Sequence, residues 1–138
     1  MSIPRYHVDS NILLRFLTGE PPGMFAAASA FIERAERGEV VLELSPLVLA
    51  ETAFTLESFV QRPRREVART LLTLVDRLGV RLAERDLLLA ALERVQSTGI
   101  HLVDAYLAAS AAETKFPVAS FDRDFDKLPN VQRFEPRP

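Results

Sequence analysis

The stretch YHVDSNILLRFL, residues 6–17, holds the transition around which the fold is organised. A short β-prone run ends at Asp9, and the apolar residues that follow recur at helical spacing, at Ile12, Leu13, Phe16 and Leu17. Asp9 is therefore expected where a strand is followed by a helix. In α/β proteins, ligands usually bind outside the carboxyl ends of the strands, which makes the Asp9 carboxylate a candidate site residue.

Strands and helices are predicted to alternate along the rest of the chain. Helices are expected at about 24–37, 46–59, 64–78, 86–96 and 102–113, strands at 40–44, 80–83, 117–121 and 131–135, and a short turn or helix at 122–127. Such alternation implies crossover connections and a mainly parallel sheet. The sequence therefore predicts an α/β fold, and its length favours a single domain over residues 1–138.

The composition excludes several classes of protein. The chain has no cysteine, hence no disulfide framework or thiolate metal site, and its two histidines are too few for a His-based zinc cluster. We find neither a signal peptide nor an apolar run long enough for a membrane span, and expect a cytoplasmic protein. The net charge of -2 is unlike that of a generic nucleic-acid binder.

Four carboxylates occupy positions that the pattern assigns to the interior. Asp9 and Asp122 each follow an apolar strand, whereas Glu51 and Asp104 share helix faces with apolar side chains. A buried carboxylate is costly unless it is paired or bound to a metal. Local explanations remain open for two of them: Asp104 could interact with a helix dipole, and Asp122 could cap the following turn.

A cluster of carboxylates without histidine or cysteine favours a hard cation, Mg²⁺ or Mn²⁺. The cation would offset the repulsion between the acids, generate hydroxide from water and bind a phosphate oxygen. Hydrolysis of a phosphodiester is the natural chemistry of such a centre.

Four segments resemble, in order, the conserved-acid blocks of the PIN-domain nucleases: DSNILLRFL (9–17), AETAFTLE (50–57), VDAYLAASA (103–111) and ASFDRDFDKL (119–128). The set is most similar to the VapC-type toxins of bacterial toxin–antitoxin pairs. The resemblance implies a three-layer α/β/α sandwich with a mainly parallel central sheet, cleavage of RNA with Mg²⁺ or Mn²⁺, and silencing by a cognate antitoxin protein.

The same resemblance assigns roles to the four acids. Asp9 and Asp104 would bind the metal most directly, and Glu51 and Asp122 would complete the catalytic pocket. Asp124 is either a fifth acid or a local cap.

Two polar residues and one departure also follow from the resemblance. Ser10 and Asn11 match the polar residues after the first acid and would hydrogen-bond to the metal ligands. Lys115 stands near a position where related proteins have glycine, which affects the local turn and not the site.

Two surfaces are candidates for contacts with other molecules. Six arginines against two acids between Arg62 and Arg81 give a local charge of +4, and Arg64, Arg65 and Arg69 form either an RNA-binding face or a solvated one. Surplus apolar residues predict a homodimer or a partner helix; they are Phe25, Phe31, Leu56 and Phe59. An arginine of the antitoxin could pair with the acids and exclude the cation.

Two rival functions remain. A PIN fold kept for protein contacts would have little or no nuclease activity. A phosphohydrolase with an aspartyl nucleophile typically needs a second aspartate two residues after the first, and Asn11 stands there in this chain.

Overall fold

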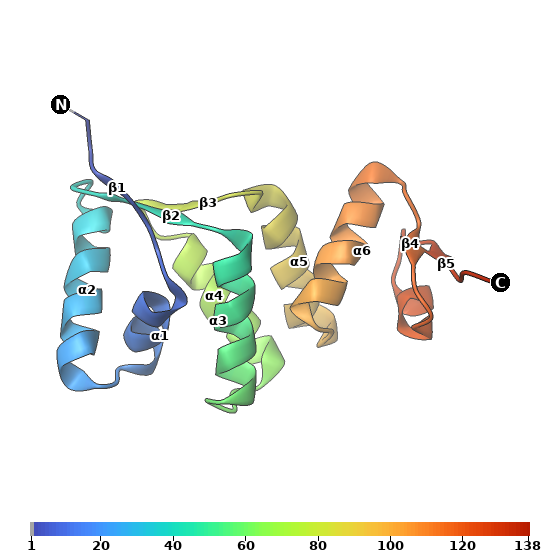
Figure 1. Cartoon of the computed structure of the whole chain (residues 1–138), viewed down its shortest axis with the longest axis horizontal. Helices are drawn as coiled ribbons and strands as arrows, with labels where there is room; N and C mark the ends of the chain where they lie inside the picture. The colour runs from blue at the N-terminus through green and yellow to red at the C-terminus, as the bar shows by residue number, and fades with distance from the viewer. Residues whose placement is uncertain (1) are drawn as a thin grey trace.

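The computed structural model describes residues 2–138, which alternate between helices and short strands (Figure 1). The elements are β1 (Arg5–His7), α1 (Ser10–Thr18), α2 (Pro22–Glu36), β2 (Val41–Leu44), α3 (Pro46–Ser58), α4 (Arg64–Val75), β3 (Val80–Leu82), α5 (Arg85–Thr98), α6 (Leu102–Thr114), β4 (Val118–Ala119), the 3₁₀ helix η1 (Arg123–Lys127) and β5 (Arg133–Phe134).

The ends of several elements follow from local chemistry. Ser45 caps α3 by accepting a hydrogen bond from the backbone N–H of Val48 at 3.1 Å, and Pro46 occupies the first turn. Lys115 ends α6 with φ of 67°, a left-handed conformation that favours glycine. The turn expected near this position therefore forms with a lysine.

Some predicted boundaries are wrong by a few residues. The helix expected at 64–78 ends at Val75, and the strands expected at 117–121 and 131–135 shorten to Val118–Ala119 and Arg133–Phe134. Leu78 and Phe121, which lie in predicted parts of these elements that do not form, are exposed.

The first sheet has three parallel strands in the order β1-β2-β3, with β2 in the centre. One face of it is buried through Leu42, Leu44 and Leu82, and on the other face Glu43 is half-buried. Helices α1 to α5 pack around the buried face and share one core, whose most enclosed side chains include Leu49 and Leu71. The α/β fold and the parallel central sheet are as predicted.

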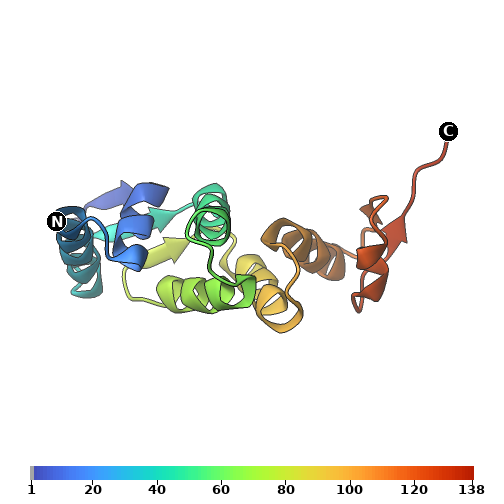
Figure 2. The same ribbon diagram turned by 90° about the horizontal axis from the view of Figure 1, so that it is seen from below.

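The second sheet is separate from the first. Strands β4 and β5 pair in parallel with each other, and a small core of Ala111, Val118 and Phe125 joins them to the end of α6 and to η1. We call residues 102–134 the C-terminal unit. Figures 1 and 2 both place β4 and β5 beyond α6, at the opposite end of the molecule from β1.

Of the four apolar residues expected on a partner-binding surface, only some are exposed. Leu56 is fully buried in the core, so its assignment to that surface is wrong, and Phe31 is half-buried. Phe59 is 82% exposed and Phe25 is 37% exposed. Within residues 2–138, none of the helices is both long and apolar enough to span a membrane.

Candidate functional site

The first group of candidate residues lies where β1 passes into α1. Asp9 occupies the N-cap position of α1 in extended conformation, is exposed, and makes no capping hydrogen bond with its side chain. The next residue, Ser10, is buried, and its hydroxyl donates to a carboxylate oxygen of Glu51 on α3 at 2.7 Å. This bond links the strand exit to α3, so Asp9 and Glu51 belong to one end of the first sheet. Asn11 is exposed beside them.

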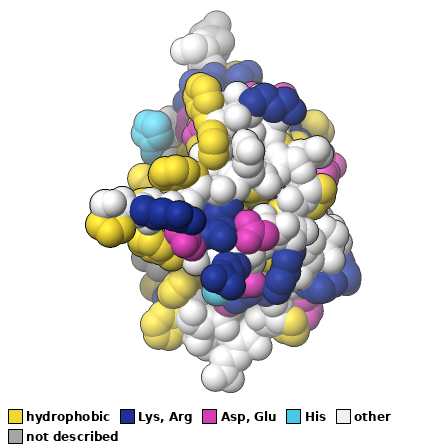
Figure 3. Space-filling view, turned by 90° about the vertical axis from the view of Figure 1, so that its right-hand side faces the viewer, with side chains coloured by type: hydrophobic (Ala, Val, Ile, Leu, Met, Phe, Trp, Pro, Cys, Tyr) yellow, Lys and Arg dark blue, Asp and Glu magenta, His cyan; other side chains and the backbone are white. Residues whose placement is uncertain are grey.

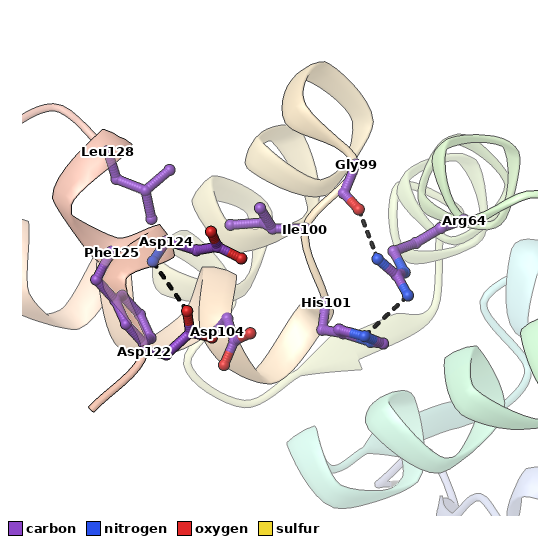
Figure 4. A pocket seen from close by; sticks show the side chains of 9 residues that line it. All are labelled: Arg64, Gly99, Ile100, His101, Asp104, Asp122, Asp124, Phe125 and Leu128. Carbon is purple, nitrogen blue, oxygen red and sulfur yellow. Dashed lines mark hydrogen bonds between the residues drawn. The ribbon is translucent and has the colours of Figure 1, made fainter. Parts of the chain in front are cut away.

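The second group lines a cavity of about 410 Å³ between α6, η1 and the connection from α5 to α6 (Figure 4). Asp104 enters it from the first turn of α6, and Asp122 and Asp124 enter it from the segment after β4. One oxygen of Asp122 accepts from the backbone N–H of Asp124 at 2.9 Å, and Asp124 pairs with Lys127 at 3.1 Å. The cavity therefore has three carboxylates in its wall.

The hydrogen-bonding of these acids separates their roles. Asp122 caps η1, as its local explanation predicted, and its other oxygen accepts no hydrogen bond from the described residues. Among residues 2–138, no hydrogen bond or ion pair engages the carboxylate of Asp104, which is half-buried. Asp104 is thus the acid of the cavity whose oxygens are most available to a cation.

The structure does not bring the two groups together. Within the described part of the chain, no three side chains of histidine, cysteine, aspartate or glutamate are close enough to bind one metal ion. Asp104 lines a second pocket with Ala50 and Ala53 of α3, whereas β4, the strand before Asp122, lies at the opposite end of the molecule from β1 (Figure 1).

A model of the PIN domain family matches residues 6–131, nearly the whole chain. The chain belongs to the PIN domain family. Nucleases of this family typically use divalent metal ions. No curated protein matches the sequence. A solved structure with a similar chain is described as VapBC2 from Rickettsia felis bound to a DNA fragment from their promoter; the match has 15% identity, covers 94% of this chain and 97% of that chain, and has a TM-score of 0.38.

The donors of this PIN domain suit Mg²⁺ or Mn²⁺, but their arrangement does not complete a site. Carboxylate oxygens are the protein ligands that these hard cations prefer, and the two groups offer little else. Each group alone supplies too few ligands on one centre. The ligand types therefore suit the ion, but the residues are too far apart to bind it together.

The face of α3 that carries Glu51 is exposed and not buried as predicted. Glu51 was expected on an apolar face of its helix that is buried, but Leu47 and Phe54 on that face are 82% and 61% exposed, and Glu51 is exposed with them. Asp9 and Asp122 are also exposed. Apolar neighbours on α3 indicate a face that is unpaired here, not a core.

Two residues of the cavity wall were not predicted there. Arg64 pairs with Glu57 at 2.8 Å, donates to the carbonyl of Gly99 at 2.6 Å and contacts Nε2 of His101 at 2.9 Å (Figure 4). A guanidinium can only donate, so His101 accepts. His101 is the N-cap residue of α6, and nothing in its own segment indicates that Arg64 would reach it across 37 positions.

The predicted arginine face is divided between two roles. Arg64 lines the acidic cavity, and Arg65 donates to the carbonyl of Ser97 at 3.1 Å. Arg69 is exposed on α4. At the end of the molecule that carries β4 and β5, acidic and basic side chains are interspersed (Figure 3), so this end is not a uniformly basic surface.

Proposed function

We propose that this PIN domain is a metal-dependent endoribonuclease that hydrolyses RNA phosphodiester bonds, and that it is the toxin of a type II toxin–antitoxin system. The observation that carries the proposal is the cavity whose wall contains Asp104, Asp122 and Asp124 together with Arg64. Carboxylates suit a divalent cation, and an arginine beside them suits a phosphate. Family membership supports the same chemistry.

In this proposal the metal is held by Asp9, Glu51, Asp104 and Asp122 when their two groups meet. Bound there, the cation would polarise the phosphodiester and lower the pKa of an attacking water. The protein's own contribution is to position these ligands: the Ser10 hydroxyl orients Glu51, and the cap on η1 fixes Asp122.

Substrate would be bound through phosphate contacts. Arg64 in the cavity wall could meet the phosphate next to the cleaved bond, and Arg65 and Arg69 would contact neighbouring ones. Each such contact to a single strand contributes about 0.7 to the slope of log affinity against log salt concentration. Replacing Arg65 and Arg69 by Gln should flatten that slope and leave metal binding unchanged.

The biological setting follows from the harm that an active ribonuclease does to its own cell. We propose a cytoplasmic homodimer silenced by a cognate antitoxin, whose arginine would pair with Asp9, Asp104 or Asp122 and exclude the cation. Such an antitoxin would compete with Mn²⁺. Inhibition that leaves Mn²⁺ binding intact would contradict this mode of silencing.

Cleavage of RNA by the purified protein, with and without Mn²⁺, tests the proposed activity. Asp9→Asn and Asp104→Asn keep side-chain shape and remove charge, so each should abolish metal-dependent cleavage while the protein stays folded. Asp86→Asn is the matched control, because Asp86 is exposed on α5 outside both acidic groups. Full activity in either site variant would refute the assignment.

One observation favours the second candidate, a PIN-fold protein-interaction module with little or no nuclease activity. The two acidic groups do not form a complete metal site in the described residues. Absence of Mn²⁺-dependent cleavage in the wild-type protein, together with specific binding of a partner protein, would favour that module.

A further inference from the structure

Both strands that precede a candidate acid have a free edge. Among the described residues, β1 pairs only with β2, and β4 pairs only with β5. Asp9 follows β1 and Asp122 follows β4 within a few residues. A free edge presents unpaired N–H and C=O groups and readily pairs with another strand.

The molecule also exposes more surface than a compact monomer of its size. The 15.4 kDa chain exposes 8595 Å², whereas the scaling of surface with mass gives about 7,200 Å². The excess is about 1,400 Å² per chain. Large apolar side chains contribute to it in both parts of the molecule: Phe54 and Phe59 at α3, and Phe116 and Phe121, each 72% exposed, in the C-terminal unit.

Hydrogen bonds hold the C-terminal unit in this open position. Arg64 bonds to the carbonyl of Gly99 and to His101, and Arg65 bonds to the carbonyl of Ser97, which fixes the connection from α5 to α6. Further along, the hydroxyl of Tyr106 on α6 donates to Glu84 before α5 at 2.7 Å. With α6 in this position, β4 pairs with β5 and lies at the opposite end of the molecule from β1 of its own chain.

We propose that the free edge of β1 is filled by β4 of a second copy of this chain, so that two copies exchange their C-terminal units. Covering the excess on both copies would bury about 2,800 Å² in total, within the range of obligate homodimers. Exchange of identical elements is a low-cost route to a dimer, because each contact already suits the sequence.

The exchange would complete the acidic site from two chains, an inference that rests on the proposed function. The strands within each sheet are parallel, so a parallel β1–β4 pairing brings the carboxyl ends of both strands to one edge. Asp9 and Glu51 of one chain would then face Asp104 and Asp122 of the other. Each dimer would contain two such sites.

Complementation between two inactive variants tests the exchange. Asp9→Asn and Asp104→Asn are mixed in denaturant, refolded together and assayed for Mn²⁺-dependent RNA cleavage. In an exchanged heterodimer one of the two sites has all four native acids, so the mixture should recover about one quarter of wild-type activity. If each chain completes its own site, every site in the mixture carries a substitution and no activity returns.

Cross-linking tests the same exchange without activity. The chain has no cysteine, and His7 on β1 and Ala119 on β4 are exposed and outside the proposed site. His7→Cys and Ala119→Cys chains, refolded together and treated with a short bis-maleimide, should form a covalent dimer linked between these two positions. The double variant should likewise link between chains, and each single variant refolded alone is the control.

The two experiments distinguish the exchange from the proposed activity. Cross-linking between positions 7 and 119 of different chains supports the exchange even if wild-type protein does not cleave RNA, in which case only the proposed function fails. Links within single chains of the double variant would overturn the exchange. Active wild-type protein whose variants fail to complement would overturn it as well.

Discussion

Gly79 lies where the chain enters β3, and replacing it by alanine should strongly destabilise the protein. Its φ is +81°, and an added Cβ would lie 2.4 Å from the backbone oxygen of Ala35 at the end of α2. A non-glycine residue at positive φ costs about 1 kcal/mol or more. The clash adds to this cost, because the atoms it meets belong to the backbone and cannot rotate away; over-packing of this kind costs about 1–3 kcal/mol.

Gly38→Ala separates the two contributions. Gly38 has φ of +78°, and nothing lies within 4 Å of its added Cβ. It should therefore lose only about 1 kcal/mol of unfolding free energy, whereas Gly79→Ala should lose about 2–4 kcal/mol in total. Urea denaturation followed by circular dichroism measures both. Equal losses in the two variants would refute the packing of α2 against the entry to β3.

Three further predictions concern single side chains. Lys115→Gly should raise the unfolding free energy by about 0.5–1 kcal/mol, because glycine adopts the left-handed backbone conformation of Lys115 without strain. A lower unfolding free energy in urea denaturation would contradict that conformation. Ser10→Ala should lower it by about 1 kcal/mol, because the hydroxyl bonded to Glu51 is buried, and the same titration would show an unchanged midpoint if the bond does not form. The hydrogen bond from Arg133 holds the pKa of Asp126 below its usual range, so Asp126 contributes stability that is lost as the pH falls below about 4; Asp126→Asn should make stability less dependent on pH in that range, and an unchanged dependence would exclude the pair as its source.

The sequence predicted features that depend on neighbouring residues. The apolar spacing after Asp9 predicted α1, and the pair Ser45 and Pro46 predicted the start of α3. The alternation of helices and strands predicted parallel strands. Each of these follows from local conformational preference or from the handedness of crossovers. The family resemblance led to the same class of fold that the structure has.

Features that depend on distant residues were not predicted. Strand β4 pairs with β5 and not with β1, from which it is separated by more than 100 positions in the sequence. No local sequence pattern determines which of these two strands β4 pairs with. Glu51 lies among apolar residues of α3, but only the tertiary structure shows that this face is exposed. Likewise, Arg64 reaches Gly99 across 35 positions, so the wall of the acidic cavity could not be read from its own segment.

Crystals of the protein soaked in Mn²⁺ would show directly whether Asp9, Glu51, Asp104 and Asp122 together bind one catalytic cation. We expect an anomalous scattering peak about 2.1 Å from oxygens of Asp9 and Asp104. Tracing the two chains through the connection from α5 to α6 would show from which copy each acid comes. A Mn²⁺ ion bound by only one of the two acidic groups, or no peak at saturating Mn²⁺, would show that the four acids do not share one cation.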